Sequence, residues 1–374
     1  MDARDRLKKA ECVVVKVGTS TITYPNGKMH LKRIDHLVRE ISDLKNQGYK
    51  ILLVSSGAIA TGMNHIGMSK KPDDIPERQA LAAIGQGVLL HIYEKFFAEY
   101  GQTAAQVLLT RDNYTNHSQY SRSRDALRAL LSMDVVPIIN ENDAVSVDEL
   151  KIGDNDNLSA IVASLVDADV LIILSDIDGV YTDNPQKNSD ACLIGEIDEI
   201  TPEVERLAGG AGSGLGTGGM MTKIQAAKIA MNSGATMVIA PGNRENVISD
   251  VLSGENIGTI FPARESHLRS RKRWLAFGKR IMGDIVVDSG CEQAMRTGSS
   301  ILPAGVVSVG GVFPKGSTIR VLSEMKQEIA RGIVNYDSES LSKIMGKHTD
   351  EINGLIDGDV YDEVIHRDNM VLLV

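Results

Sequence analysis

Cysteines, aromatic residues and long apolar runs are all scarce in this 374-residue chain. The three cysteines, Cys12, Cys192 and Cys291, lie far apart and form no CxxC pair, which argues against a disulfide framework or a zinc site. Aromatic residues make up only 4%, too few for the stacking surfaces that bind single-stranded nucleic acid. No apolar run approaches the roughly 20 residues needed to cross a bilayer, and no signal peptide is evident. We therefore expect a cytoplasmic protein.

The rest of the composition is that of an ordinary globular protein, with 43% hydrophobic and 24% charged residues. A formal net charge of −9 makes general binding of polyanions unfavourable, although it leaves room for a local anion site. The length suffices for two domains, one of them large enough for a full core.

Short apolar runs alternate with longer amphipathic segments over about the first 260 residues. This alternation predicts an α/β domain, a mostly parallel open sheet sandwiched by helices. The predicted strands are 12–17, 51–54, 105–109, 135–139, 170–174 and 237–240, and the predicted helices are 31–46, 77–100, 118–131, 157–166, 220–232 and 244–253. Because parallel strands end at one edge of their sheet, we expect the site among the residues that follow the strands.

The pattern changes after residue 263. Residues 264–280 hold seven Lys or Arg against one acid, which indicates a solvated linker or a basic strip that contacts another domain or an anion. Residues 281–374 read as short strands between Gly and Pro turns, a small β-rich domain. The predicted organisation is thus a domain over 1–263, a basic linker over 264–280 and a second domain over 281–374.

Two strand ends near the N-terminus carry polar residues that suit an anion. In VVVKVGTS, Lys16 interrupts a run of valines, so it either serves a polar site or reaches out of the strand end. In LLVSSGAIATG, a strand breaks at Ser55, Ser56 and Gly57 into a predicted helix. Hydroxyls and free N–H groups at a helix start suit a carboxylate or phosphate, while a plain N-cap serine explains the same residues.

The segment INENDAVSVDELKIGDNDNLSA concentrates carboxylates and amides around two strand-to-helix turns. The residues are Asn140, Glu141, Asn142, Asp143, Asp154, Asn155 and Asp156. Such a set suits an amino group, Mg²⁺ held by oxygen ligands, or the orientation of lysines. Turn and cap formation explains some of these residues but not two such bursts, so the pattern favours a functional site.

Two further segments suit a nucleotide. The buried strand of VLIILSDIDGVYTDNP ends at Ser175 and Asp176, for which an ordinary turn is the alternative. Between Gly209 and Gly219, seven of eleven residues are glycine, and a predicted helix with Lys223 in its first turn follows. Such a loop lets backbone N–H groups approach phosphates, and Lys223 adds positive charge. The segment does not match GxxxxGK[ST], and a flexible loop is the alternative reading.

Together these motifs resemble the amino-acid kinase superfamily over essentially the whole chain. SSGAIATG, NENDAVS, GDNDNLSA and GTGGMMTK, in this order, resemble the members that phosphorylate glutamate, and the C-terminal part resembles a PUA domain. The resemblance implies ATP-dependent phosphorylation of the side-chain carboxylate of L-glutamate to glutamyl 5-phosphate, the first step of proline biosynthesis, with ATP and Mg²⁺. It also implies inhibition by proline, glutamyl-phosphate reductase as a partner and a homo-oligomer, a dimer or tetramer, without membrane association.

The resemblance further implies roles for particular residues. Lys16 and Lys223 would bracket the transferring phosphoryl group, Asp156 would organise them, and the backbone of Gly57 would lie nearby. Glutamate would contact Ser56, Asp143, Asn155, Asn140 and Asp154. The nucleotide would contact Lys16, Ser175, Asp176, Thr217, Gly218, Gly219, Met220, Met221, Thr222 and Lys223. No protein ligand to a metal is assigned.

Two alternatives stay open. An enzyme of the acetylglutamate kinase, aspartokinase or nucleoside-monophosphate kinase type would keep the fold and change the acceptor. An RNA-binding role of the PUA-like part is the other alternative. Residues 281–359, however, hold seven basic and eleven acidic residues, a net charge of −4, and RNA affinity depends on neutralising phosphates.

Overall fold

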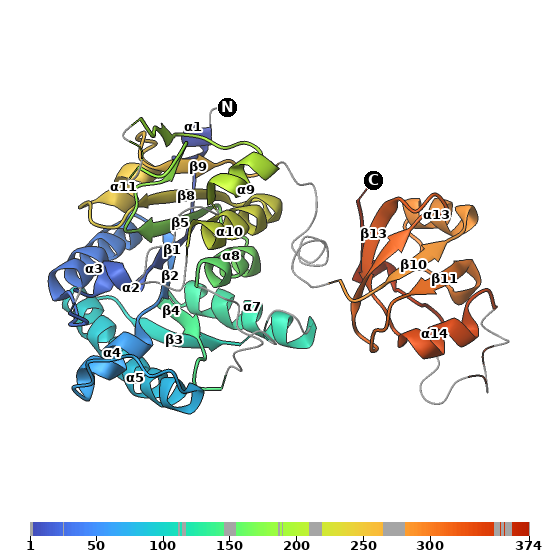
Figure 1. Ribbon diagram of the computed structural model, residues 1–374, viewed down its shortest axis with the longest axis horizontal. Coiled ribbons are helices and arrows are strands. Elements are labelled where there is room, and N and C mark those ends of the chain that lie inside the picture. The colour runs from blue at the N-terminus through green and yellow to red at the C-terminus, as the bar shows by residue number, and fades with distance from the viewer. Residues whose placement is uncertain are drawn as a thin grey trace. The chain divides into compact units, whose positions relative to one another are not determined.

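The chain folds into two compact units, Met1–Ser266 and His267–Val374, each with its own hydrophobic core (Figure 1). The computed structural model describes residues 3–24, 26–110, 113, 117–145, 155–185, 188, 190–208, 219–264, 281–347, 352, 355 and 361–373. Apart from Arg264, the predicted linker lies outside these residues, so its structure stays a prediction.

The first unit is built on a seven-stranded sheet in the order β3-β4-β2-β1-β5-β8-β9. The strands are β1 (Cys12–Val17), β2 (Lys50–Ser55), β3 (Ala104–Leu109), β4 (Val136–Glu141), β5 (Val170–Ser175), β8 (Thr236–Pro241) and β9 (Thr259–Phe261). All pairs are parallel except β8 with β9. A short hairpin, β6 (Val180–Tyr181) and β7 (Leu193–Ile194), follows β5. The predicted mostly parallel sheet is confirmed, while the antiparallel edge strand was not foreseen.

Helices cover both faces of this sheet. They are α1 (Ala3–Leu7), α2 (Thr19–Ile22), α3 (Leu31–Asn46), α4 (Ala58–His65), α5 (Ile75–Glu99), α7 (His117–Ser132), α8 (Asn155–Val166), α9 (Pro202–Ala208), α10 (Met220–Ser233) and α11 (Val247–Leu252). Figure 1 shows α3 and α11 on one face and α7, α8 and α10 on the other. The sheet therefore separates two layers of helices, as the sequence pattern predicts.

The central strand β1 faces both layers. Side chains alternate along a strand, so Val13, Val15 and Val17 join the core that includes α3, while Lys16 points to the α8 side. β1 pairs with β2 on one side and with β5 on the other. The chain adds β2, β3 and β4 on the first side and then crosses to β5, from which β8 and β9 extend the sheet in the opposite direction. In open α/β sheets, ligands bind at such a switch point, beyond the carboxyl ends of the strands.

The second unit is a five-stranded sheet in the order β11-β10-β12-β13-β14 with short helices. Its elements are β10 (Asp284–Val287), α13 (Ser289–Arg296), the 3₁₀ helix η2 (Pro303–Gly305), β11 (Val306–Gly310), β12 (Thr318–Leu322), β13 (Glu328–Ile333), α14 (Ser338–Ile344), the 3₁₀ helix η4 (Arg367–Asn369) and β14 (Met370–Leu372). Alternating residues of β10 and β12 fill its core, with Phe313 among the fully buried side chains. The predicted β-rich domain is confirmed.

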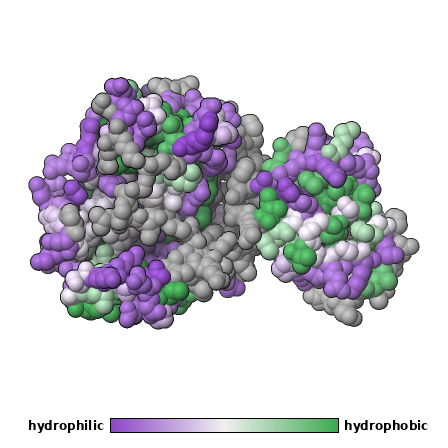
Figure 2. Space-filling model, viewed as in Figure 1, coloured by the Kyte–Doolittle hydropathy of each residue, from purple (hydrophilic) through white to green (hydrophobic). Residues whose placement is uncertain are grey.

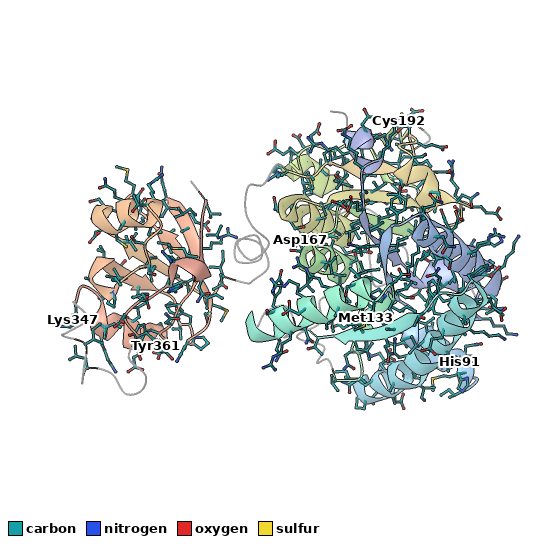
Figure 3. All side chains as sticks on the ribbon, turned by 180° about the vertical axis from the view of Figure 1, so that it is seen from behind. His91, Met133, Asp167, Cys192, Lys347 and Tyr361 are labelled. Carbon is teal, nitrogen blue, oxygen red and sulfur yellow. The ribbon has the colours of Figure 1, made fainter. Side chains whose placement is uncertain are left out.

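The cysteines are free thiols on separate elements. Burial raises the pKa of Cys12 to about 12 and that of Cys291 to about 11, which makes both thiols unreactive at neutral pH. Cys192 lies exposed at the surface of the first unit (Figure 3). Within the described part of the chain, no helix has the length and apolarity to span a membrane.

Helices α4 and α5 cross at two glycines. A Cβ added to Gly85 of α5 would stand 1.8 Å from the carbonyl oxygen of Ala58, and one added to Gly62 of α4 would stand 2.1 Å from that of Leu81. The obstacles are backbone atoms, so a side chain at either position requires the helices to move apart.

We expect Gly85→Ala to lower the free energy of unfolding by about 3 kcal/mol, because overpacking against backbone cannot be relieved by a rotamer change. Gly87→Ala on the same helix is the matched control. No atom lies within 4 Å of its added Cβ, so alanine there should stabilise by roughly 0.5–1 kcal/mol through helix propensity. Urea unfolding followed by circular dichroism measures both variants, and equal effects would contradict the close crossing.

Candidate active site

Three charged side chains from three elements meet at the carboxyl edge of the sheet. Lys16 comes from β1, Asp156 from the first turn of α8 and Lys223 from the first turn of α10. Lys16 Nζ lies 2.6 Å from Asp156 Oδ1, and Lys223 Nζ lies 3.1 Å from Asp156 Oδ2. The structure thus joins the two predicted lysines, far apart in the sequence, through one carboxylate.

This Lys16–Asp156–Lys223 cluster is almost completely buried. Asp156 is 0% exposed, and the two lysines are 5% and 6% exposed. Buried ions are tolerated when they are paired, and here each carboxylate oxygen faces one ammonium. Two ammonium groups against one carboxylate leave a net positive charge, which favours the binding of an anion.

The start of α10 adds neutral hydrogen-bond donors beside the cluster. Its N-cap is Gly219 in an extended conformation, no side chain caps the helix there, and its first turn contains no acidic residue. Free N–H groups at a helix start attract phosphate groups. Thr222 Oγ1 lies 2.9 Å from Asp156 Oδ2, which ties this first turn to the cluster. The glycine-rich residues 209–218, including the predicted Thr217 and Gly218, lie outside the described residues.

A network of amides adjoins the other side of the strand edge. Asn155, the first residue of α8, donates from Nδ2 to Ser56 Oγ and to Asn140 Oδ1, both at 2.8 Å. Asn140 lies within β4, where it is 3% exposed, and donates to Gln86 Oε1 of α5 at 2.8 Å. The structure therefore brings together three of the predicted glutamate contacts, Ser56, Asn140 and Asn155, beside the charged cluster.

The reading of Ser55 or Ser56 as an N-cap is wrong. Ser55 ends β2, and its hydroxyl lies 2.9 Å from the buried Tyr93 hydroxyl. The N-cap of α4 is instead Gly57, whose φ of 103° favours glycine. A Cβ there would also stand 2.9 Å from Ile22 Cδ1, so the backbone of Gly57 approaches α2 closely.

The other predicted residues that the structure describes lie at the same edge of the sheet. Ser175, which ends β5, is buried and donates to Asp176 Oδ1 at 3.2 Å, while Asp176 is exposed. Asp143 is partly buried in the turn after β4. On α10, Met220 is buried and Met221 is exposed. Asp154 lies outside the described residues.

Sequence reasoning missed Gln86, which orients Asn140. Its signal was a polar amide inside the otherwise small and apolar stretch LAAIGQGVLL of α5. Gln86 is 8% exposed, and a buried amide needs partners, so a single polar residue on the inner side of a helix could have marked it.

Among the described residues, no group of three or more His, Cys, Asp or Glu is placed to hold a metal ion. Mg²⁺ commonly uses one or two carboxylates together with substrate phosphates rather than an all-protein cage. Asp156 and the exposed Asp176 are two of the described carboxylates at this edge that could take such a role.

Paired lysines, a helix N-terminus and an amide network at the carboxyl edge of an open parallel sheet are typical of an enzyme that transfers phosphoryl groups. The comparisons with known proteins agree with this class. The family model of the amino acid kinase family matches residues 11–241, and that of the PUA domain matches residues 283–356.

Relatives and solved structures narrow the class. The chain is 49% identical to the glutamate 5-kinase of Moorella thermoacetica over 373 residues, 100% of this chain and 99% of that one. It is 50% identical to the glutamate 5-kinase of Thermoanaerobacter sp., over 96% and 97% of the two chains. Carbamate kinase from Giardia lamblia shares the fold, with a TM-score of 0.50 and 18% identity over 69% of this chain and all of that one. The chain belongs to the amino acid kinase family, in the group of the glutamate 5-kinases.

We expect Asp156→Asn to lower the free energy of unfolding by about 3–5 kcal/mol, because it leaves two ammonium groups buried without a counter-ion. Asp134→Asn is the matched control. Asp134 also pairs with a buried lysine, Lys45, at 3.0 Å, but its side chain is 86% exposed and Lys45 keeps its bond to the Asp134 carbonyl oxygen. The control should change stability by about 1 kcal/mol or less. Urea unfolding of the full chain decides, and equal stability of Asp156→Asn and the parent would contradict the role of the cluster.

Proposed function

We propose that this chain transfers the γ-phosphoryl group of ATP to the side-chain carboxylate of L-glutamate, giving glutamyl 5-phosphate and ADP. The observation that carries the proposal is the meeting of Lys16 and Lys223 on Asp156, next to the amide network of Asn155 and Ser56. The identity of about 50% to glutamate 5-kinases over nearly the whole chain supports the choice of acceptor.

In the proposed reaction an oxygen of the glutamate carboxylate attacks the γ-phosphorus, the new carboxyl O–P bond forms, and the bond to the β,γ-bridging oxygen breaks. The carboxylate is already ionised, so no general base is required. The difficulty is to bring one anion against another, and it is met by holding both reactants in line and by cations placed where charge develops. Lys16 and Lys223 supply those cations in our proposal, and Asp156 holds them in position.

We assign the two sides of the cluster to the two substrates. Ser56, Asn140, Asn155 and Asp143, with Asp154, would bind glutamate, and the backbone N–H of Gly57 would lie near the transferring group. The start of α10 from Gly219 to Lys223, with Thr217, Gly218, Ser175 and Asp176, would bind the nucleotide. Mg²⁺, bound with the triphosphate, would neutralise part of its charge.

The experiment that tests the function is glutamate-dependent release of ADP, with hydroxylamine added to trap the acyl phosphate as a hydroxamate. Acetylglutamate, aspartate and UMP serve as competing acceptors in parallel reactions. We expect turnover and hydroxamate with glutamate and little of either with the other three. Higher turnover with any of these three compounds would identify that compound, rather than glutamate, as the acceptor.

The RNA-binding alternative has little support in the second unit. Four of its basic residues already pair with acids: Arg296 with Glu292, Arg320 with Asp284, Arg331 with Glu328 and Lys343 with Glu339. The face drawn in Figure 2 mixes apolar and hydrophilic patches. Salt-dependent retention of RNA by the full chain, but not by a variant truncated after residue 264, would revive the alternative.

The family resemblance supports three further proposals. Proline inhibits by competing for the glutamate pocket, glutamyl-phosphate reductase receives the unstable product, and the chain works as a cytoplasmic homo-oligomer, a dimer or tetramer. A proline-dependent rise in the glutamate KM, pull-down of the reductase and sedimentation velocity test them in turn.

Lys16→Ala and Lys223→Ala should each lower kcat by about 100-fold or more, because each removes one preorganised cation at the transferring phosphoryl group. Circular dichroism should show both variants folded. Lys45→Ala is the control, since it removes another buried, ion-paired lysine, in the last turn of α3 and outside the residues assigned to the site, and should leave kcat near that of the parent. Near-normal turnover of Lys16→Ala would remove Lys16 from the mechanism.

Asp143→Ala should raise the glutamate KM about tenfold or more with little change in kcat, since Asp143 is assigned to the non-reacting end of the acceptor. Asp176→Ala, at the end of the β5 strand, is the matched control and should raise the ATP KM instead. Initial rates with each substrate varied in turn separate the two. A fall in kcat at an unchanged glutamate KM would overturn the assignment of Asp143.

A further inference from the structure

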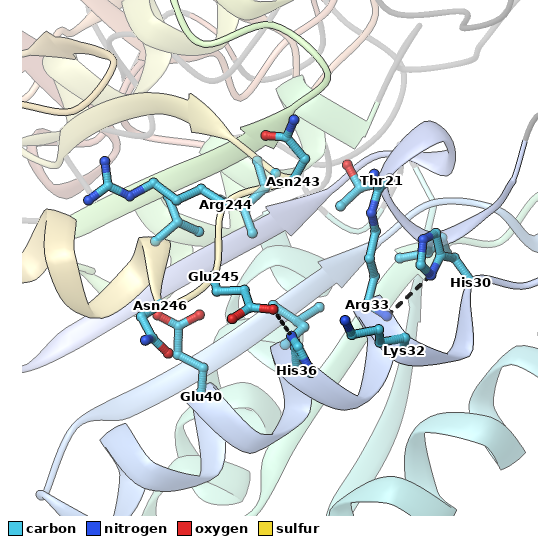
Figure 4. A pocket seen from close by; sticks show the side chains of 15 residues that line it. Thr21, His30, Lys32, Arg33, His36, Glu40, Asn243, Arg244, Glu245 and Asn246 are labelled. Atoms are coloured by element: carbon cyan, nitrogen blue, oxygen red, sulfur yellow. Dashed lines mark hydrogen bonds and ion pairs between the residues drawn. The ribbon is translucent and has the colours of Figure 1, made fainter.

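A cavity of about 200 Å³ lies on the sheet face opposite the charged cluster (Figure 4). It is enclosed by α2, the first half of α3, and the loop that joins β8 to α11. Leu174 of β5 lines it and belongs to the core beneath α3, whereas Lys16 of the neighbouring β1 points to the α8 side. The cavity therefore lies on the other face of the sheet from the Lys16–Asp156–Lys223 cluster, although the N–H of Gly242 in its lining donates to the carbonyl oxygen of Ser175 at 2.7 Å. It is smaller than the roughly 300–1,000 Å³ of sites for drug-sized ligands, so it suits a small metabolite.

Most charged groups that line this cavity are engaged by neighbouring residues. Glu245 Oε1 lies 3.2 Å from His36 Nδ1, and Arg244 pairs with Asp250 at 2.7 Å. Glu40 accepts hydrogen bonds from the Ser249 N–H and hydroxyl at 2.8 and 3.1 Å. Burial raises the pKa of Glu40 above its ordinary value, and the hydrogen bonds from Ser249 oppose this shift.

Two cations that line the cavity, Lys32 and Arg33 in the first turn of α3, are not engaged in this way. Among the described residues, neither Lys32 nor Arg33 pairs with a carboxylate, and α3 has no acidic residue in its first turn. Figure 4 shows Arg33 extending from α3 toward α2, where its Nη1 lies 3.5 Å from the Ser20 carbonyl oxygen. Burial, with the nearby charges of Arg33 and Lys32, lowers the pKa of His30, as expected in a positive local potential. The cavity thus carries an excess of positive charge on one wall.

A second observation points to a missing partner at the same place. Thr21, which lines the cavity, is 7% exposed, and its Oγ1 is buried without a hydrogen-bond partner among the described residues. The hydroxyl lies against Gly242, where an added Cβ would stand 3.0 Å from Oγ1. A buried hydroxyl without a partner is unfavourable by about 1–3 kcal/mol, so such a group is expected to bind water or a ligand.

We propose that this cavity binds a small anion, a carboxylate or a phosphate, through Arg33, Lys32 and the Thr21 hydroxyl. Arg33 supplies planar paired donors for either group, Lys32 a point charge and Thr21 a neutral donor. The site is coupled to the catalytic edge through α2. Thr21 lines the cavity, and the next residue, Ile22, contacts both the cavity and the backbone of Gly57. An anion bound in the cavity therefore restrains α2, which packs against Gly57 on the proposed glutamate side of the active site.

The test is isothermal titration of the full chain with sodium phosphate and, separately, sodium acetate, at constant ionic strength set by chloride. A Lys32→Gln/Arg33→Gln variant removes both cations, and Arg39→Gln, on the exposed side of the same helix, is the matched control. We expect binding of at least one anion to the parent and to Arg39→Gln, and weakening by about tenfold or more in the double variant. The arm that binds more tightly identifies the preferred anion.

Thr21→Val keeps the shape of the side chain and removes the hydroxyl. It should raise the Tm of the anion-free protein and weaken anion binding. Hydrogen exchange locates the bound anion: it should slow exchange at 19–23 in the parent but not in the double variant. Anion binding that survives the double substitution but is lost in Lys223→Ala would place the anion at the catalytic cluster and overturn the proposal. So would absence of binding of both anions to the parent. Neither result depends on whether the chain phosphorylates glutamate.

Discussion

The buried contact of one carboxylate with two ammonium groups is the constraint on which the arrangement of the first unit depends. Lys16, Asp156 and Lys223 come from β1, α8 and α10, and each would be unstable at its depth without the others. Separating any one of these elements from the others exposes an unpaired charge in a low-dielectric interior. The cluster therefore fixes where α8 and α10 start relative to β1, and their first turns, which face the edge of the sheet, are fixed with it.

A single strand then divides the molecule into two chemical environments. The odd-numbered valines of β1 pack under α3, and Lys16 on the opposite side meets α8 and α10. The anionic reactants of the proposed reaction belong on the Lys16 side, while the cavity of Arg33 and Thr21 lies on the valine side. Helix α2, four residues directly after β1 and Gly18, lines the cavity and packs close to Gly57. A short turn at the end of a rigid strand is well placed to connect two sites without moving the core.

The sequence predicts the elements well because their signals are local. The strands 12–17 and 170–174 and the helix 31–46 show as apolar runs and amphipathic repeats, and they agree with β1, β5 and α3 to within a residue. The motifs also place Lys16, Asp156 and Lys223 at strand or helix ends, so their meeting follows from a parallel sheet. Three features could not be predicted: the left-handed Gly57 that replaces a serine cap, the identity of Asn140 as the partner of Gln86, and the cavity between α3 and the β8–α11 loop. Each depends on tertiary contacts between distant segments, which leave no periodic signal.

The distribution of charge in the site agrees with transfer to a carboxylate. The cations lie in the cluster beside α10, whereas the adjoining groups of Ser56, Asn140 and Asn155 are neutral. A cation paired with the acceptor carboxylate would stabilise the bound reactant as much as the transition state and would make the carboxylate less nucleophilic. Such a cation would strengthen the binding of the acceptor without accelerating the reaction. In the proposed assignment neutral donors orient the acceptor without that penalty, while the two ammonium groups lie where negative charge would accumulate on the transferring oxygens. In the proposed assignment Asp143 faces the non-reacting end of the acceptor, so neutral donors adjoin the reacting carboxylate and the cations lie on the phosphate side, as a reaction between two anions requires.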